Sequence, residues 1–264
     1  MCIIAVKFKG SDFCPAETVA RCMETNPHGF SMAWNQDGHV LVYRTMSAGS
    51  LLEKYKELVA TLDPRQTGLV FHARIATHGS HRVENCHGFT HGNMAFFHNG
   101  VLRGVESRDD KTDSEVFFRD FFAPIHDAMG MKEALRLSAF YIGQTNNKFA
   151  VITGDGEINR VSGSVKFSKN QFKDCRGKIY FSNDSWKPAE SLEDTHSLFG
   201  GYGRSGSFKH PDTPRASTSL PRVGPRERTS GAGASFLQKA LTPRPGADGT
   251  VDLESLFQDL YTHR

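Results

Sequence analysis

The chain has 264 residues, 38% of them hydrophobic, and a formal net charge of +3 at pH 7. This length suits one large domain or slightly more, and the apolar content is enough for a packed core, which excludes a wholly disordered chain. The near-neutral charge argues against a histone-like nucleic-acid binder. The sequence has no run approaching about 18 apolar residues, no signal peptide and no Cys-x-x-Cys pair. We therefore expect a soluble, cytoplasmic protein without a disulfide framework or a thiolate zinc site.

The first 190 residues carry apolar segments whose spacing predicts strands and helices. We expect strands over residues 2–8, 29–34, 39–43, 68–75, 94–98, 149–153, 158–161 and 179–182. We expect helices over residues 15–24, 50–62, 113–129 and 131–140. The segment Asn35-Gln36-Asp37-Gly38 is a hairpin-turn signal. The third helix should place Val116, Phe117, Phe121 and Ile125 on one face. This order indicates an α+β domain over residues 1–190, with two sheets and helices outside them.

The composition changes after residue 190. Residues 203–244 contain eight basic and two acidic side chains and are rich in Ser, Pro and Gly. Such a segment buries too little surface to offset its chain entropy, so we interpret residues 191–250 as a flexible basic linker. It lacks regularly interleaved aromatic residues, and we expect a solvated tether instead of a nucleic-acid contact. Residues 251–264 are acidic, with Leu253, Leu256, Phe257 and Leu260 at the spacing of a short amphipathic helix over 251–262.

The second residue is the first candidate for chemistry. Methionine aminopeptidases remove Met1 when a small residue follows, and Cys2 qualifies. The chain would then begin with an α-amine of pKa about 7.7–8.0 and a thiol of pKa about 8.5 on one residue. The amine, or a water that it holds, can take the thiol proton near neutral pH and create a nucleophile. The alternative is that Cys2 is a small apolar residue of an edge strand.

Three further motifs place polar side chains where a strand ends or a helix begins. Arg74 and Thr77 follow a buried strand, and arginine is the best side chain for a bidentate grip on a carboxylate. Asn99-Gly100 ends another strand and offers the neutral N–H donors that an oxyanion hole needs. Asp113 begins a helix that either Thr112 or Asp113 could cap, and the Asp113 carboxylate could instead hold an ammonium group. Each motif alone also fits a structural role, namely a surface ion pair, a hairpin turn or a helix cap.

The histidines raise the question of a metal. Six of the twelve lie within residues 72–98. The segment has no His-Glu-x-x-His motif and no flanking cysteine pair. We therefore expect no metal and no other cofactor.

The order of the motifs is more specific than any one of them. Cys2 is followed by His72-Ala73-Arg74-Ile75-Ala76-Thr77-His78-Gly79, Asn85-Cys86-His87, His98-Asn99-Gly100 and Thr112-Asp113-Ser114-Glu115. In this order the motifs resemble the glutaminase domain of class II glutamine amidotransferases, which are N-terminal-nucleophile hydrolases. The resemblance covers about residues 2–185. It implies the four-layer αββα sandwich of that superfamily, here in a stand-alone short form followed by a disordered tail.

The resemblance also implies a role for each matching position. Cys2 would be the nucleophile that attacks the glutamine side-chain amide, forms a thioester and releases ammonia. Asn99 and Gly100 would form the oxyanion hole. The residues implied to bind the substrate are Arg74 for the α-carboxylate, Asp113 for the α-ammonium group, and Thr77, His78 and His87 beside them.

The fate of the ammonia stays open. Ile3 after Cys2, Ile75 after Arg74 and Gly88 after His87 depart from the usual family pattern, and no P-loop or large synthase domain follows residue 190. We expect a glutamine amidohydrolase that passes ammonia to an acceptor on a partner synthase, with the C-terminal helix as a docking element. One alternative is a stand-alone hydrolase of γ-glutamyl amides. Another is an inactive scaffold that keeps the glutaminase fold.

Overall fold

The computed structural model describes residues 2–76, 80–108, 110–163, 173–174 and 179–187. They belong to one unit that extends to Lys187. The predicted linker and the predicted helix over 251–262 lie outside the described residues. Among the residues that the structure describes, no helix combines the length and apolar character needed to cross a bilayer.

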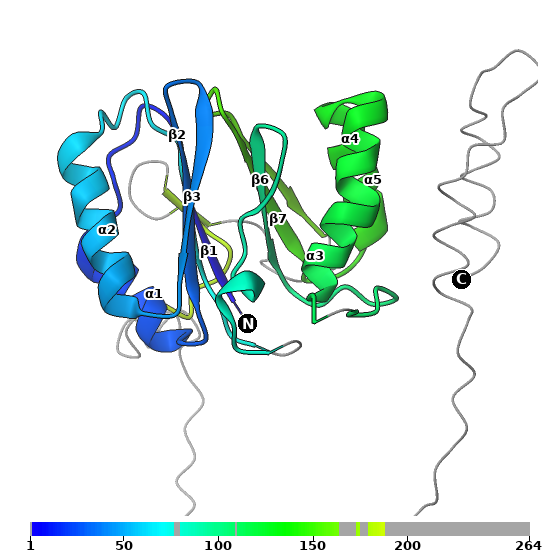
Figure 1. Cartoon of the computed structure of the whole chain (residues 1–264), viewed down its shortest axis with the longest axis horizontal. Helices are drawn as coiled ribbons and strands as arrows, with labels where there is room; N and C mark the ends of the chain where they lie inside the picture. The colour runs from blue at the N-terminus through cyan, green and yellow to red at the C-terminus, as the bar shows by residue number, and fades with distance from the viewer. Residues whose placement is uncertain (1, 77–79, 109, 164–172, 175–178, 188–264) are drawn as a thin grey trace, which may run out of the picture. The chain divides into compact units, whose positions relative to one another are not determined.

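Two antiparallel sheets form the centre of this unit (Figure 1). The first has the strand order β3-β2-β4-β1-β10-β9. Its strands are β1 (Ile3–Lys7), β2 (Phe30–Gln36), β3 (His39–Thr45), β4 (Leu69–Ala73), β9 (Lys173–Asp174) and β10 (Ile179–Phe181). The second sheet has the order β5-β6-β7-β8, with β5 (Phe89–His91), β6 (Met94–Asn99), β7 (Lys148–Thr153) and β8 (Ile158–Ser162).

Strand β1 lies inside the first sheet, between β4 and β10. Its side chains alternate between two clusters of buried residues, as the period of two in a strand requires. Ile3 and Ala5 pack with residues of the two helices α1 (Ala16–Thr25) and α2 (Ala48–Thr61). Ile4 and Val6 pack instead with residues of β6 and β7 in the second sheet. The segment that follows Cys2 is therefore an interior strand, not the edge strand of the alternative interpretation.

The remaining helical segments follow β6 in the chain. They are α3 (Asp113–Phe117), the π-helical segment η2 (Phe118–Phe122), α4 (Ala123–Met129) and α5 (Met131–Ile142). Figure 1 shows α3, α4 and α5 beside the second sheet, on the side away from α1 and α2. A π turn adds a residue to one helical turn and rotates the side chains that follow it.

This π turn corrects one prediction. Phe117 and Ile125 are buried as expected, but Phe121 is only partly buried, and Phe118 and Phe122 enter the core in its place. The other strands and helices predicted within the described residues are confirmed, with bounds that differ by a few residues. The predicted hairpin is also confirmed, because Gln36 pairs with His39 across a two-residue turn. Three short segments were not expected, namely β5, β9 and the 3-10 turn η1 (Val83–Asn85).

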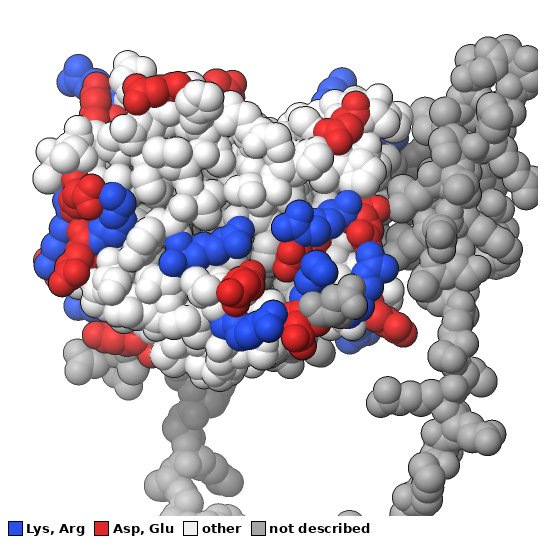
Figure 2. Space-filling view, in the orientation of Figure 1, with Lys and Arg blue, Asp and Glu red and all other residues white. Residues whose placement is uncertain are grey.

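Charged side chains of both signs are interspersed on the face shown in Figure 2. Several form ion pairs at the surface, such as Arg82 with Asp110 at 3.4 Å and Lys54 with Glu57 at 2.7 Å. Exposed pairs of this kind contribute on the order of 0–1 kcal/mol each. The packing of the sheets and helices therefore determines the fold far more than these surface charges do.

Candidate active site

Cys2 lies just before β1 and is partly buried. Its sulfur accepts a hydrogen bond from the Ile75 backbone N–H, with Sγ and N 3.4 Å apart, and lies 3.5 Å from the Ile75 carbonyl oxygen. The Cys2 carbonyl oxygen accepts a hydrogen bond of 2.7 Å from Asn183 Nδ2. Burial raises the pKa of the Cys2 thiol, and the Ile75 N–H and the Arg74 charge counteract part of this rise. The thiol is thus fixed beside the residue that follows Arg74.

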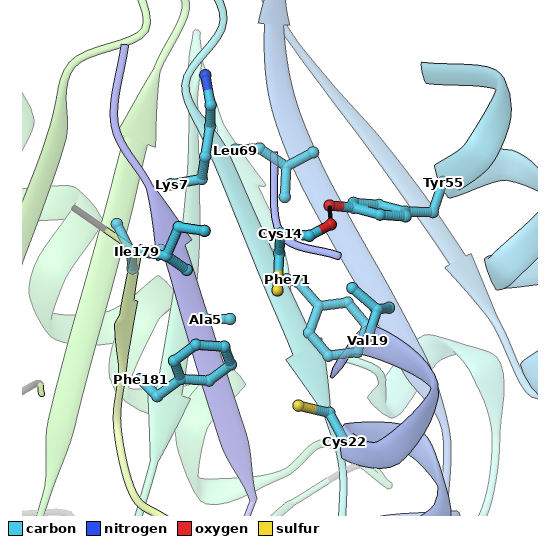
Figure 3. A pocket seen from close by; sticks show the side chains of 11 residues that line it. Ala5, Lys7, Cys14, Val19, Cys22, Tyr55, Leu69, Phe71, Ile179 and Phe181 are labelled. Carbon is cyan, nitrogen blue, oxygen red and sulfur yellow. Dashed lines mark hydrogen bonds between the residues drawn. The ribbon is translucent and has the colours of Figure 1, made fainter. Parts of the chain in front are cut away.

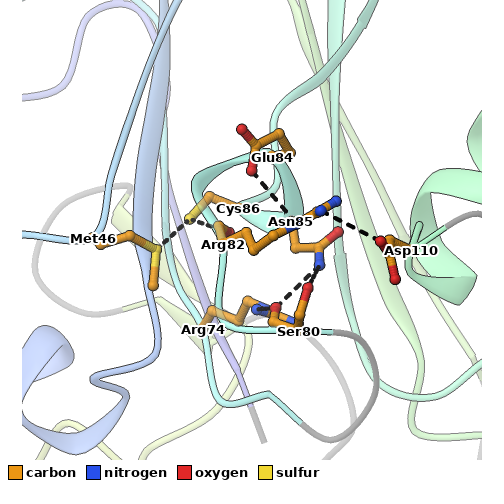
Figure 4. A network of polar contacts seen from close by, with 8 residues as sticks. All are labelled: Met46, Arg74, Ser80, Arg82, Glu84, Asn85, Cys86 and Asp110. Carbon is orange, nitrogen blue, oxygen red and sulfur yellow. Dashed lines mark hydrogen bonds and ion pairs between the residues drawn. The ribbon is translucent and has the colours of Figure 1, made fainter.

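Arg74 continues directly from β4, and only 2% of its surface is exposed. Its backbone N–H donates to Gly29 O at 2.9 Å, which fixes the main chain here. Its guanidinium Nη1 donates to Ser80 O at 3.0 Å, and Asn85 Nδ2 donates to the same oxygen at 3.0 Å (Figure 4). Burial lowers the pKa of Arg74, while Cys2, Cys86 and Asp113 counteract this effect. The Arg74 guanidinium is therefore close enough to the Cys2 thiol and the Asp113 carboxylate for their charges to affect its pKa.

Asn99 ends β6 in the second sheet, and a hydrogen-bond chain connects it to β1 in the first. Asn99 Nδ2 donates to Ser182 Oγ at 2.8 Å, and Ile4 N donates to the same hydroxyl oxygen at 2.9 Å. Ser182 N in turn donates to Ile4 O at 2.9 Å. Ser182 therefore holds the Asn99 side chain close to the strand that begins after Cys2.

Asp113 is the first residue of α3 and is almost fully buried. Thr112, not Asp113, caps the helix, because its hydroxyl accepts a hydrogen bond from Glu115 N at 3.2 Å. Asp113 Oδ2 accepts from Leu102 N at 2.8 Å, and Oδ1 accepts from Ser114 N at 2.8 Å. Ser114 Oγ also lies 3.2 Å from Oδ1, whereas Oδ2 has one partner among the described residues and can accept a second hydrogen bond. The carboxylate is therefore fixed against the chain that follows Gly100 and can still accept from a ligand.

His87 packs against two other histidines. It is buried in the interior, and its ring stacks on that of His72 with the centroids 4.1 Å apart. Its Nδ1 accepts a hydrogen bond of 3.2 Å from His98 N. The predicted residues Thr77 and His78 lie outside the described residues.

The hydrogen bonds thus join Cys2 to the residue after Arg74, Asn99 through Ser182 to the strand that follows Cys2, and Asp113 to the chain that follows Gly100. Sequence reasoning missed Ser80, Asn147, Ser182 and Asn183, which hold these residues in place. The only local signal for Ser182 and Asn183 is that two polar residues directly follow a short apolar strand. Nothing local in the sequence relates Asn147 to residues 98–101, since the contact arises from the pairing of β6 with β7.

The described residues also contain a small cavity between the first sheet and the helices α1 and α2. Lys7, Cys14, Cys22 and Tyr55 line it together with apolar side chains (Figure 3). Its volume of about 10 Å³ is close to what a single water needs. It includes none of the predicted site residues and is too small for an amino acid. Among the described residues, no three His, Cys, Asp or Glu side chains are grouped so that they could hold a metal ion.

Comparison with known proteins identifies the family. A family model described as class II glutamine amidotransferases matches residues 12–162, which is more than half of the chain. The match includes Arg74, Asn99, Gly100 and Asp113 and starts after Cys2. No curated protein matches. A solved glutamine aminotransferase class-II domain protein from Silicibacter pomeroyi is similar at 16% identity, over 68% of this chain and 87% of that chain, with a TM-score of 0.41. On the family match, this chain belongs to the class II glutamine amidotransferases.

Proposed function

We propose that this protein is a glutaminase of the amidotransferase type, with Cys2 as its nucleophile once Met1 is removed. Membership of the family supports a glutamine-hydrolysing or amidotransferase role. The observation that carries the proposal is the position of Cys2, whose sulfur contacts the backbone of Ile75, next to the buried Arg74. We further propose that the described unit has the αββα layering of N-terminal-nucleophile hydrolases. The separate clusters that α1 and α2 form with β1, and that β1 forms with β6, support this arrangement.

The charges of the site suit a free amino acid. Arg74 would hold the α-carboxylate of glutamine, because a guanidinium can donate two parallel hydrogen bonds to it. Asp113 would hold the α-ammonium group with the acceptor sites that its backbone contacts leave open. Thr77 and His78, which follow Arg74 in the chain, would complete the carboxylate end of the site. His87 would support this region from the interior through its stack with His72.

The reaction needs only groups of this chain and one water. The α-amine of Cys2 takes the thiol proton, and the sulfur attacks the amide carbon to form a C–S bond. Asn99 Nδ2 and the Gly100 N–H would stabilise the oxyanion of the tetrahedral intermediate. The C–N bond then breaks, and the ammonium of Cys2 returns the proton to the leaving ammonia. Water hydrolyses the thioester to glutamate and restores the thiol.

We propose that the released ammonia passes to an acceptor on a partner synthase in the cytoplasm, where reducing conditions keep the thiol free. The amphipathic helix expected over 251–262 is the proposed docking element. Truncation after residue 195 should then leave basal glutamine hydrolysis unchanged and abolish only transfer to the partner. Loss of basal hydrolysis in the truncated chain would contradict this division of labour.

The direct test is intact mass before and after incubation with 6-diazo-5-oxo-L-norleucine, a glutamine analogue that alkylates such nucleophiles. We expect a chain without Met1 and a single adduct on Cys2. Cys2→Ala should abolish both the adduct and glutamine hydrolysis, with the fold intact. Cys22→Ala is the matched control, because it removes a thiol that is buried in the core of the first sheet and α1. It should keep the adduct and the turnover.

The alternatives predict other results. A protein that cleaves γ-glutamyl amides much faster than glutamine would be a γ-glutamyl hydrolase that uses the same residues. A chain that retains Met1, forms no adduct and turns over neither substrate would be an inactive scaffold, and the proposed function would be wrong.

A further inference from the structure

His98 links two segments that carry parts of the proposed site. It precedes Asn99 in β6 and is almost fully buried. One ring nitrogen, Nδ1, lies 2.8 Å from Ser114 Oγ at the start of α3. The other, Nε2, lies 2.8 Å from Asn147 Oδ1, just before β7. The His98 imidazole therefore connects the start of α3 with Asn147, the residue before β7.

The hydrogen-bond partners of His98 determine which of its ring nitrogens carries a proton. An amide oxygen can only accept, so His98 Nε2 carries a proton and donates it to Asn147. Burial lowers the pKa of His98 and favours the neutral ring, in which Nδ1 has no proton. Nδ1 can then only accept, so the single proton of the Ser114 hydroxyl points to Nδ1 at 2.8 Å and not to Asp113 Oδ1 at 3.2 Å. Ser114 N remains bonded to Asp113 Oδ1 at 2.8 Å, so the same residue contacts both His98 and the carboxylate.

Asn147 contacts the turn that follows Asn99. Its Nδ2 donates to Val101 O at 3.1 Å and to Thr145 Oγ1 at 2.9 Å. Gly100 lies directly against it, because a Cβ atom added to Gly100 would fall 2.0 Å from Asn147 Oδ1. The Asn147 amide thus receives a hydrogen bond from His98 on one side and holds the turn at Gly100 on the other.

We propose that His98 is a positioning residue, which through Asn147 and Ser114 fixes the Asn99-Gly100 donors relative to the Asp113 carboxylate. This inference rests on the proposed function, because it concerns the geometry of the same site. His98 takes no proton from the substrate in this role. It acts through Asn147 on the donors used in the transition state, and through Ser114 on the carboxylate used in substrate binding.

The two arms of this network predict different kinetic effects. Asn147→Ala releases Val101 O and leaves space beside Gly100, so the oxyanion donors lose their alignment. We expect kcat for glutamine to fall at least about 10-fold, with KM within about 3-fold of wild type. Ser114→Ala removes the hydroxyl contact of His98 next to Asp113, and we expect mainly KM to rise, by about 3- to 10-fold. His98→Gln loses both fixed contacts and should show both effects.

Ser138→Ala is the matched control, because it removes a buried hydroxyl from α5, outside this network. It should leave kcat and KM within about 2-fold of wild type. Thermal unfolding of every variant separates loss of alignment from loss of fold. If Asn147→Ala does not fold, Asn147→Asp serves instead, because it keeps the acceptor for His98 but loses the donor to Val101 O. It should also lower kcat at least about 10-fold.

The outcomes separate the two claims. If the wild-type chain hydrolyses glutamine and a folded Asn147 variant keeps its kcat within about 2-fold, the positioning role of His98 is wrong while the proposed function stands. The positioning role would also be wrong if kcat and KM changed equally in all three variants and in proportion to their loss of stability. The effect would then be a general loss of structure. If the wild-type chain neither hydrolyses glutamine nor reacts with the analogue at Cys2, the proposed function itself fails.

Discussion

At the scale of single residues, Gly100 leaves almost no room for a larger side chain. Its φ of +145° is a conformation that residues with a Cβ atom rarely adopt, and the space where that atom would lie is taken by Asn147 Oδ1. The Asn147 amide is itself held by His98 and Val101. It cannot move away without breaking these bonds, so the clash must displace the turn that carries the Gly100 N–H.

We therefore expect Gly100→Ala to lower kcat/KM for glutamine at least about 100-fold, because the proposed oxyanion donors move. Glutamine hydrolysis and thermal unfolding of the variant are the measurements. Gly10→Ala is the control, since Gly10 also has a positive φ of 80° but nothing lies within 4 Å of its Cβ position. The control should lose some stability and keep its activity. A Gly100→Ala variant as active as wild type would show that this turn does not carry the donors.

The candidate site divides into residues that local sequence reveals and residues that it hides. Arg74, Asn99 and Asp113 end a strand or begin a helix, where the periodicity of the neighbouring residues makes them visible. Ser182 and Asn147 are different, because they contact residues 83 and 49 positions away in the chain. No period or turn chemistry encodes such a pairing. The sequence is enough to propose a nucleophile and binding residues, whereas the residues that contact them become visible only in the folded sheets.

At the scale of elements, the sequence predicts most directly those segments that contain a recognisable turn sequence. The Asp37-Gly38 turn has positive φ at both residues, as the tight hairpin between β2 and β3 requires, and the sequence predicts it directly. The segment η2 is the opposite case. Its π turn does not follow the 3.6-residue period, so an assumed regular helix placed Phe121 in the core and missed Phe118 and Phe122.

The π turn makes a measurable difference between two neighbouring phenylalanines. Phe122 is fully buried and packs on Phe96 with a centroid distance of 5.4 Å. Phe122→Ala should lower the free energy of unfolding by about 3–5 kcal/mol because it leaves a cavity. Phe121 is partly exposed and stacks on Phe117 at 4.9 Å. We expect Phe121→Ala to cost less than half as much in urea unfolding. The reverse order would mean that the helix is regular here.

At the scale of the whole described unit, three buried histidines lie close to one another in the interior. His72 and His87 stack on each other, and His98 lies parallel to His87 with a centroid distance of 6.3 Å. Neither ring nitrogen of His72 makes a hydrogen bond of good geometry among the described residues. Burial, followed by the charge of Arg74, lowers the pKa of His72 from 6.5 to about 3. Burial also lowers the pKa of His87.

These shifts predict how the stability of the unit depends on pH. The unfolded chain binds a proton at His72 below a pH of 6.5, whereas the folded chain does so only below about 3. Between these values the unfolded state binds more protons, so the free energy of unfolding decreases as the pH falls. For His72 alone the decrease from pH 7 to pH 5.5 should be about 1 kcal/mol. Above a pH of about 7 this residue contributes no further pH dependence.

His72→Leu tests this account, because leucine has a similar volume, cannot be protonated and removes no ring hydrogen bond of good geometry. In urea unfolding at the two pH values, the variant should lose about 1 kcal/mol less stability on acidification than the wild type does. His39→Leu is the control for a histidine that is exposed at the start of β3. It should keep the wild-type pH dependence. If His72→Leu is as sensitive to acid as the wild type, a neutral His72 between the sheets does not limit stability, and the acid sensitivity must arise from other groups such as His87.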